Sequence, residues 1–203
     1  KPKKCPVIPY SGFHGENLVD PTDKMPWYKG WSANLNKDTT IQGVTILDAL
    51  EKYVKPPKRN LDGPLRIPIG QTYNIKGVGA VICGRVEQGV AKLEDKIAIA
   101  PGGFNDLKLF SLEMHRKKYS EAVPGDNVGM TIKGLDKNNM PKSGDLIFRP
   151  AEGMVKPTKS FVAQVVVQEH PGQLNVGFSP IIYCRTAKTA CKMTKINWKM
   201  GKK

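Results

Sequence analysis

The sequence predicts a mainly β fold built around one complete antiparallel β-barrel. Six short β-rich runs lie between residues 65 and 149, separated by Gly, Pro, Asn and Asp, with no helical stretch between them. Closely spaced short strands of this kind are typical of small closed barrels. Polar, proline-containing breaks flank the region at 56–64 and 151–159. We therefore expect three parts, which are 1–62, the barrel at 63–157, and a second β region at 158–203.

The part before the barrel is mixed in character. Residues 5–9 are predicted as a strand and 15–20 as a short helix, while 21–43 is polar and rich in turn residues. Apolar side chains then recur at helical spacing, with Thr45 as the expected N-cap. These side chains are Ile46, Leu47, Leu50, Tyr53 and Val54. Pro56-Pro57 ends this helix, because proline cannot donate a backbone hydrogen bond within it.

Each barrel strand is predicted from a short β-rich run bounded by turn residues. The six runs are 65–69, 78–87, 96–100, 107–113, 127–133 and 146–149. After the second break, 161–167, 180–184 and 188–194 are predicted as further strands. Three strands by themselves leave two sheet edges and an apolar face uncovered. We therefore expect these strands to be part of a larger domain.

The composition is that of a globular protein with a strong positive charge. The 203 residues include 32 Lys and Arg against 18 Asp and Glu, a net charge of +14. Such a charge favours polyanionic partners, such as RNA, the ribosome or an acidic membrane surface. From Arg185 to the end there are seven basic side chains and no acidic one. No run has the length of a membrane span or the pattern of a signal peptide, so we expect no membrane insertion and a cytoplasmic location.

The cysteines do not form a metal-binding pattern. No two of the four cysteines form a C-x-x-C pair, and no histidine lies at metal-ligand spacing from any of them. The cysteines are Cys5, Cys83, Cys184 and Cys191. We expect reduced, mostly buried thiols, as in cytosolic proteins, and no metal site.

Three segments partly match GTP-binding motifs but lack the residues that those motifs require. Residues 79–86 have the glycine spacing of a phosphate-binding loop, yet Arg85-Val86 stands where Lys-Ser/Thr is needed. In 36–39 the aspartate of an Asn-Lys-x-Asp motif comes one residue early, and 126–129 is predicted as a turn. The histidines have no accompanying nucleophile motif. We therefore expect no catalytic residue in this chain and no GTP hydrolysis by it alone.

A series of short motifs occurs in a defined order along the chain. They are Ser11-Gly12-Phe13-His14-Gly15-Glu16-Asn17-Leu18, Met25-Pro26-Trp27-Tyr28-Lys29-Gly30-Trp31, Gly84-Arg85-Val86-Glu87, Ser111-Leu112-Glu113-Met114-His115, Pro124-Gly125-Asp126-Asn127-Val128-Gly129, His170-Pro171-Gly172-Gln173, and Cys184-Arg185-Thr186-Ala187 with Ala190-Cys191-Lys192. Together they closely resemble the eukaryotic and archaeal elongation factor 1-alpha family, relatives of bacterial elongation factor Tu. The resemblance covers essentially the whole chain and rests on the shared order of the motifs.

The resemblance implies a GTPase domain followed by two β-barrels. Residues 1–62 would be the C-terminal remnant of a P-loop type α/β domain plus a linker, 63–157 the second domain, and 158–203 the first strands of the third. The intact protein would use GTP and GDP with Mg²⁺, bind aminoacyl-tRNA, deliver it to the ribosomal A site and hydrolyse GTP on codon recognition. A guanine-nucleotide exchange factor is a further implied partner, and actin binding, known for some family members, is left open.

The same resemblance implies site residues at matching positions. Ser11, Gly12 and Phe13 would line the guanine pocket. The residues expected at the 3′ end of aminoacyl-tRNA are Glu113, Glu87, Tyr73 and Arg85. A single-stranded terminal base can stack on an aromatic ring and be held by polar groups at its edge. For Tyr73 and Glu87, an ordinary strand position is an equally open interpretation.

The basic C-terminal stretch is implied to contact the tRNA backbone, through Arg185, Lys188 and Lys192. A solvated basic face is the alternative. Arg185 and Lys188 stand where many family members carry histidine, and Gln88 replaces a common threonine. These departures affect details of the tRNA contacts rather than the family resemblance.

Two other functions remain open at the level of sequence. One is a termination or ribosome-rescue GTPase, whose partner is a protein that mimics tRNA. Such paralogues fit less well at 113–115 and 170–173. The other is a non-enzymatic RNA-binding or cytoskeletal adaptor built on a barrel, which the basic charge permits.

Overall fold

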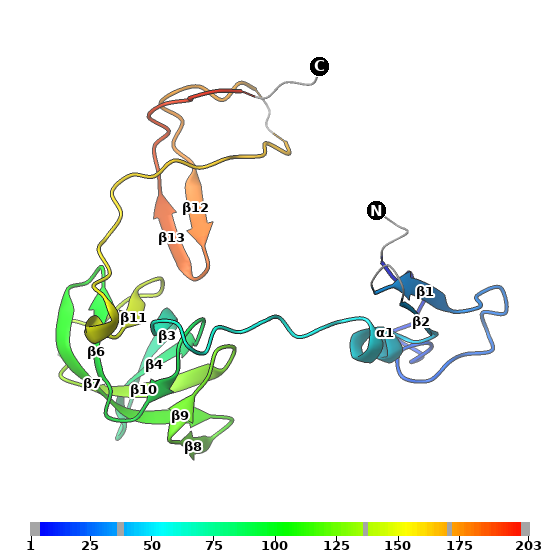
Figure 1. Cartoon of the computed structure of the whole chain (residues 1–203), viewed down its shortest axis with the longest axis horizontal. Helices are drawn as coiled ribbons and strands as arrows, with labels where there is room; N and C mark the ends of the chain where they lie inside the picture. The colour runs from blue at the N-terminus through cyan, green and yellow to red at the C-terminus, as the bar shows by residue number, and fades with distance from the viewer. Residues whose placement is uncertain (1–4, 36–38, 136–137, 170–171, 200–203) are drawn as a thin grey trace. The chain divides into compact units, whose positions relative to one another are not determined.

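The structure is a computed structural model that describes residues 5–35, 39–135, 138–169 and 172–199. It divides into two compact units, Lys1–Lys58 and Arg59–Lys203, and each is described by itself (Figure 1). Asp38, the aspartate of the segment that partly matches Asn-Lys-x-Asp, lies outside the described residues. So does the dipeptide His170-Pro171. In the part of the chain that is described, no helix has the length and apolar character needed to cross a membrane.

The first unit consists of a hairpin and one short helix. Strand β1 (Trp31–Asn34) pairs antiparallel with β2 (Thr40–Gly43), and helix α1 spans Ile46–Lys52. The predicted cap is confirmed: the Asp48 N–H donates to Thr45 Oγ1 at 3.1 Å, and the Thr45 N–H donates to Asp48 Oδ2 at 3.1 Å. Such a capping box satisfies backbone donors that the first turn leaves free. The β1–β2 hairpin was not predicted, since 21–43 has few β-branched residues.

Acid should loosen helix α1 through Asp48. Lys52 lowers the pKa of the Asp48 carboxyl far below its usual range, and the N–H groups of Val44 and Thr45 add to this. A carboxyl with a lower pKa in the folded than in the unfolded state stabilises the fold above about pH 4, and the stabilisation is lost as the pH falls further. We expect Asp48→Asn to speed amide hydrogen exchange in α1 about fivefold at pH 7.

The matched control for this prediction is Glu51→Gln on the same helix, because Glu51 is exposed and takes no part in the cap. As the pH falls below about 4 toward the much lower folded-state pKa of Asp48, the exchange rate of the wild-type helix should approach that of the Asp48→Asn helix at the same pH. Equal exchange rates in the two variants at pH 7 would contradict a capping role for Asp48.

The predictions of a strand at 5–9 and a helix at 15–20 are wrong. Residues 6–10 pair with no strand, and Ser11 and Glu16 form an isolated bridge around a tight loop. Asn17, only 1% exposed, has a φ of 55°, which a continuing helix does not allow. Its side chain instead donates to the Pro9 carbonyl at 2.9 Å and accepts from the Thr22 N–H at 3.0 Å. A buried asparagine therefore organises this segment as a loop.

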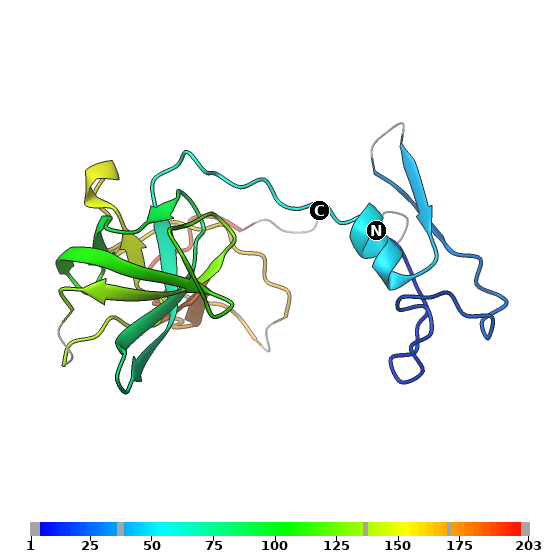
Figure 2. The same ribbon diagram turned by 90° about the horizontal axis from the view of Figure 1, so that it is seen from below.

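The second unit contains the barrel. Its strands are β3 (Arg66–Ile75), β4 (Gly79–Arg85), β6 (Lys96–Ala100), β7 (Phe104–Met114), β10 (Asn127–Lys133) and β11 (Leu146–Phe148). They follow the order β10-β4-β3-β11-β6-β7, and pairing of β7 with β10 closes the ring. Strand β8 (Lys117–Tyr119) adds to β7, and β5 (Ala91–Lys92) pairs with β9 (Glu121–Ala122). Figure 2 shows the strands of the barrel from a second direction. The predicted closed antiparallel barrel is confirmed.

Alternating side chains fill the barrel. Along β10, Val128, Met130 and Ile132 are buried while the residues between them face outward. This period of two is what a strand with one buried face requires. The buried cluster also includes Leu65, Ile67, Ile69, Ile82, Val86, Ala91, Ile97, Ile99, Leu107, Leu109, Leu112, Ala122 and Ile147. The core therefore lies inside the ring, and the polar positions of β4, β7 and β10 lie on its outer surface.

Residues after the barrel form one further hairpin, reached through a short helix, η2 (Pro150–Glu152). Strand β12 (Ile181–Cys184) pairs with β13 (Ala187–Ala190), close to two of the predicted runs. The predicted strand at 161–167 is wrong, because the described chain offers it no neighbouring strand. Val162 and Val166 are accordingly 86% and 80% exposed.

All four cysteines have free thiols. The expectation that they are mostly buried is wrong: Cys5 and Cys184 are exposed, and Cys83 and Cys191 are half-buried. Partial burial raises the pKa of the Cys83 thiol above its usual value.

Candidate nucleic-acid interface

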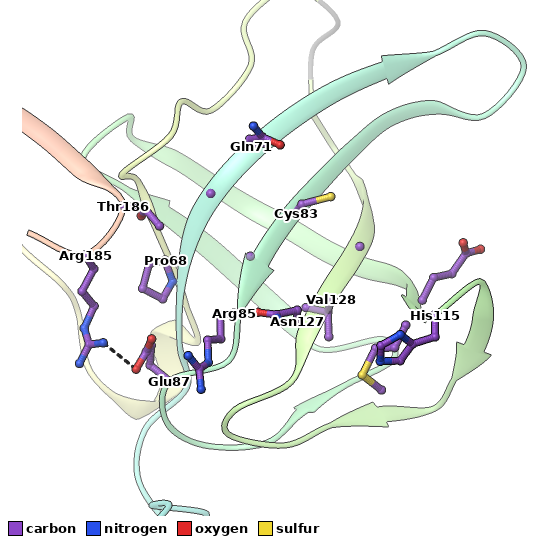
Figure 3. A pocket seen from close by; sticks show the side chains of 15 residues that line it. Pro68, Gln71, Cys83, Arg85, Glu87, His115, Asn127, Val128, Arg185 and Thr186 are labelled. Carbon is purple, nitrogen blue, oxygen red and sulfur yellow. Dashed lines mark ion pairs between the residues drawn. The ribbon is translucent and has the colours of Figure 1, made fainter. Parts of the chain in front are cut away.

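An open pocket of about 760 Å³ lies on the outer surface of the barrel (Figure 3). Its floor comes from β3, β4, β7 and β10, and the turn between β12 and β13 supplies one wall. The lining residues are Pro68, Gly70, Gln71, Cys83, Gly84, Arg85, Glu87, Glu113, Met114, His115, Asn127, Val128, Gly129, Arg185 and Thr186.

Strand register brings the floor residues together. Asn127 on β10 lies opposite Arg85 on β4, and Gly129 lies opposite Cys83 on one side and Glu113 on the other. Alternation places all of these on the outward face of their strands. Because Gly129 has no side chain, the floor is hollow between Cys83 and Glu113.

Two glycines shape the wall formed by β3 and β4. The register of this pair shifts between Ile69 and Gln71, so Gly70 is the extra residue of a β-bulge. Bulges bend a strand and redirect its side chains, and here Gln71 lines the pocket. At Gly84 the strands approach so closely that an added Cβ would lie 2.7 Å from the Pro68 carbonyl oxygen. The glycine of Gly84-Arg85 is therefore needed for packing.

The far end of the pocket is the β7–β8 turn. Met114 pairs with Lys117, which leaves His115 and Arg116 as a two-residue loop with φ values of 50° and 63°. Positive φ at both positions is the requirement of a type I′ hairpin turn, normally met by Asn-Gly. The unusual residues at this turn put the imidazole of His115 at the pocket rim (Figure 3).

The near end of the pocket is closed by the β12–β13 turn. Arg185 Nη1 lies 2.9 Å from Glu87 Oε2. The Thr186 carbonyl accepts a hydrogen bond from Ser143 Oγ at 3.2 Å. An added Cβ at Gly144 would lie 2.6 Å from the Ala187 Cα, so the hairpin backbone packs directly on this glycine. The hairpin tip is thus in contact with the barrel at several points.

The pocket contains two positive and two negative side chains. Arg85 and Arg185 balance Glu87 and Glu113, so their formal charges sum to zero. Glu113 is exposed on β7 and forms no ion pair with any residue that the structure describes. A free carboxylate beside amide and imidazole groups can accept hydrogen bonds from a hydroxyl or an exocyclic amine. Among the described residues, no three His, Cys, Asp or Glu side chains gather as metal ligands would.

Three of the four residues expected at a tRNA 3′ end line this one pocket: Glu113, Glu87 and Arg85. Tyr73 does not line the pocket; its side chain is 46% exposed. Its hydroxyl donates a hydrogen bond to Oε1 of Gln71, which does line the pocket. Glu87 lies just past the end of β4 rather than within the predicted strand.

Of the three residues expected at the tRNA backbone, Arg185 lines the pocket and Lys188 and Lys192 do not. The Lys188 Nζ lies 5.6 Å from the ring centroid of Tyr183. Lys192 is exposed beyond β13. The motif analysis did not identify Gln71, Cys83 and Asn127 as site residues, because only the strand register reveals them as neighbours of Glu113 and Arg85.

The Ser11-Gly12-Phe13 segment forms a loop of its own in the first unit. The Ser11 N–H donates to the Glu16 carbonyl at 3.1 Å, and Ser11 Oγ accepts from the His14 N–H at 3.2 Å. The Phe13 ring is 93% exposed and forms an edge-to-face contact with the His14 ring at a centroid distance of 4.9 Å. The loop is therefore closed by its own backbone and presents its tip to solvent.

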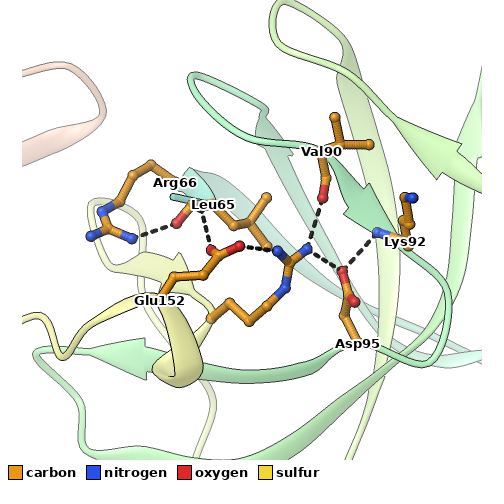
Figure 4. A network of polar contacts seen from close by, with 7 residues as sticks. Leu65, Arg66, Val90, Lys92, Asp95 and Glu152 are labelled. Carbon is orange, nitrogen blue, oxygen red and sulfur yellow. Dashed lines mark hydrogen bonds and ion pairs between the residues drawn. The ribbon is translucent and has the colours of Figure 1, made fainter. Parts of the chain in front are cut away.

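A second, smaller pocket lies where the barrel begins and ends (Figure 4). Arg149 Nη2 donates to the Val90 carbonyl at 2.8 Å and to Asp95 Oδ2 at 2.7 Å, and its Nη1 pairs with Glu152. Glu152 also accepts from the Leu65 N–H at 2.7 Å. Burial alone would lower the pKa of Arg149, but the two carboxylates raise it. Both Nη atoms of the guanidinium bind protein groups, whereas its buried Nε has no hydrogen-bond partner among the described residues. The Nη contacts join separate parts of the barrel, so this pocket is structural.

Comparison with known proteins agrees with this geometry. Residues 79–148 match the family model of elongation factor Tu domain 2, and residues 160–203 match that of the GTP-eEF1A C-terminal domain-like family. The closed six-strand barrel with its extra strand therefore defines part of a translation elongation factor.

Relatives aligned over the whole chain specify the family. The chain is 40% identical to elongation factor 1-alpha of Onchocerca volvulus, over 100% of this chain and 43% of the relative. It is 40% identical to elongation factor 1-alpha-A of Schizosaccharomyces pombe and 37% identical to elongation factor 1-alpha of Serendipita indica, over 100% of this chain and 44% and 43% of the relatives. The chain belongs to the elongation factor 1-alpha family, and it spans less than half the length of these curated relatives.

A solved structure, the apo form of translation elongation factor SelB from Methanococcus maripaludis, aligns over 52% of this chain and 22% of that chain. The TM-score is 0.45 and the identity 26%, a likeness too low to support a conclusion about the fold.

Proposed function

We propose that the chain belongs to a GTPase that carries aminoacyl-tRNA to the ribosomal A site, and that the pocket of Figure 3 holds the aminoacylated 3′ end of the tRNA. The observation that carries this proposal is the convergence of Glu113, Glu87 and Arg85. Arg85 and Glu87 come from one motif of the family pattern and Glu113 from another, and all three line a single pocket.

The shape and chemistry of the pocket suit a single-stranded RNA end. The pocket is open to solvent, so that a terminal nucleotide can enter while the helical part of the RNA stays outside. The free Glu113 carboxylate can accept hydrogen bonds from the ribose hydroxyl or the adenine amine, which an unstacked terminal base exposes. The overall charge of +14 supplies long-range attraction for the phosphates.

The GTP-dependent part of the function rests on the first unit. Ser11, Gly12 and Phe13 would lie beside the guanine ring, and their loop is exposed and closed by its own hydrogen bonds. Bound GTP with Mg²⁺ would supply the hydrolysis step that ends delivery. This sequence has no Gly-x-x-x-x-Gly-Lys-Ser/Thr segment, so the chain by itself should not hydrolyse GTP.

The domain division that follows is 1–62 for the end of the GTP-binding domain and its linker, 63–157 for the second domain, and 158–203 for part of the third. The ribosome and a guanine-nucleotide exchange factor are proposed partners of the whole protein, and actin binding remains a prediction without structural support.

The proposal is tested with an RNA hairpin that ends in a single-stranded 3′ tail and carries an amino acid through a non-hydrolysable amide link. The 203-residue chain should bind it more tightly than the same hairpin without the amino acid, as measured by fluorescence anisotropy at low salt. Glu113→Gln should weaken binding about fivefold to tenfold, because the carboxylate accepts stronger hydrogen bonds than an amide.

The control is Glu121→Gln, an identical change of an exposed residue on β9 outside the pocket. It should leave the affinity within twofold of wild type, since the lost acceptor is not at the site. Equal binding of the charged and uncharged hairpins would refute the proposal and favour a paralogue whose partner is not aminoacyl-tRNA.

A further inference from the structure

We infer that Arg185 is a positioning residue for the RNA-end pocket: it holds the Glu87 carboxylate against the β12–β13 turn and cancels its charge. The inference rests on the proposed function and adds to it a residue outside the 79–148 region of the matched barrel family.

The ion pair is asymmetric in a way that suits positioning. The Glu87 side chain is 27% exposed, whereas that of Arg185 is 62% exposed, and their atoms lie 2.9 Å apart. Glu87 is thus set into the pocket wall, while Arg185 reaches it from the hairpin tip (Figure 3). Among the described residues, Arg185 is the one ion-pair partner of Glu87, so its guanidinium fixes where the Glu87 carboxylate points.

The backbone at Arg185 is also unusual. Arg185 has a φ of 53°, in the left-handed region that glycine occupies most easily. A hairpin loop of two residues imposes this conformation, because Cys184 pairs with Ala187. A non-glycine residue held in such a conformation is a recognised sign of a functional constraint. The Ser143 and Gly144 contacts fix the same turn on the barrel.

Charge explains what the pair does for an RNA end. With Arg185 in place, two arginines balance two glutamates in the pocket. Without it, Glu87 faces the pocket with no counter-ion among the described residues, and the pocket carries a net negative charge. Phosphates of an entering RNA end would then be repelled.

The test is a double-mutant cycle on the 203-residue chain, with the aminoacylated RNA hairpin as the probe. Arg185→Ala and Arg185→Gly should each weaken binding about threefold to fivefold, the range of a well-placed exposed ion pair. The glycine variant suits the backbone at this position, so it separates loss of the guanidinium from loss of the turn. In a Glu87→Gln background, the same two changes should alter affinity less than about 1.5-fold.

Lys156→Ala serves as the control for loss of one positive charge, because Lys156 is exposed between the barrel and the hairpin. It should leave affinity nearly unchanged. If Arg185→Ala weakens binding equally with Glu87 and with Gln at position 87, Arg185 contacts the RNA directly and the inference fails. It also fails if neither Arg185 variant affects binding. If the wild-type chain binds no aminoacylated hairpin, the proposed function itself fails.

Discussion

Replacing Gly129 with valine is expected to weaken binding of the aminoacylated RNA hairpin about tenfold or more, which corresponds to about 1.4 kcal/mol or more. Gly129 lies on the outward face of β10, between Cys83 and Glu113, where the pocket is hollow. A branched side chain there would occupy the space that the proposed function assigns to the terminal nucleotide.

The fold should tolerate this substitution. An added Cβ at Gly129 would lie 3.7 Å from Val81 Cγ1, 3.8 Å from the Glu113 carbonyl oxygen and 4.0 Å from Cys83 Sγ, all ordinary contact distances. Valine is also favoured in strands, where a branched side chain packs well on the pleated surface. The thermal midpoint of the barrel should therefore stay close to that of the wild type.

The matched control is Thr131→Val on the same strand. Thr131 lies two residues further along β10, on the same outward face, and is not part of the pocket. This variant should bind the hairpin with wild-type affinity. If Gly129→Val unfolds no part of the barrel and still binds normally, the terminal nucleotide lies elsewhere and the site assignment is wrong.

Replacing Arg149 with alanine is expected to lower the free energy of unfolding of the barrel unit by about 2–3 kcal/mol. Arg149 joins three separate segments: the Val90 carbonyl, Asp95, and Glu152, which in turn accepts from the Leu65 N–H (Figure 4). Without the guanidinium, the Val90 carbonyl and the two carboxylates each lose one contact, although Asp95 still accepts from the Lys92 N–H and Glu152 from the Leu65 N–H. The Arg149 side chain is 23% exposed, so water can replace part of the loss, and the effect should stay below that of a fully buried pair.

The measurement is urea denaturation of the 203-residue chain, monitored through amide signals of the barrel. Lys96→Ala on β6 is the control, because Lys96 is an exposed strand residue and also loses one positive charge. Its effect should be within about 0.5 kcal/mol. A loss of similar size for both variants would mean that the Arg149 network contributes no more than surface charge.

Local sequence patterns predicted the strands of the barrel more reliably than the segments around it. The predicted bounds of 96–100 and 127–133 coincide with β6 and β10, because Val128, Met130 and Ile132 alternate with outward residues. The strand at 161–167 was predicted from the same kind of run and is not formed. A strand needs a partner that accepts its hydrogen bonds, and composition does not reveal whether one is present.

The candidate site shows the same division. Motif positions were enough to name Glu113, Glu87 and Arg85, and the structure places all three in one pocket. They did not identify Gln71 as a lining residue, since its orientation follows from the Gly70 bulge. Arg185 was expected at a tRNA backbone, and its contact with Glu87 emerged only from the packing of the hairpin on the barrel.

The sequence by itself determined the mainly β class, the helix capped by Thr45, the alternation that fills the core, and the family to which the chain belongs. Only the tertiary structure decided that β7 pairs with β10 to close the ring, and which side chains from distant segments share the pocket. The physical reason is range. Alternation and capping depend on neighbours along the chain, whereas closure and the pocket depend on register between strands far apart in sequence.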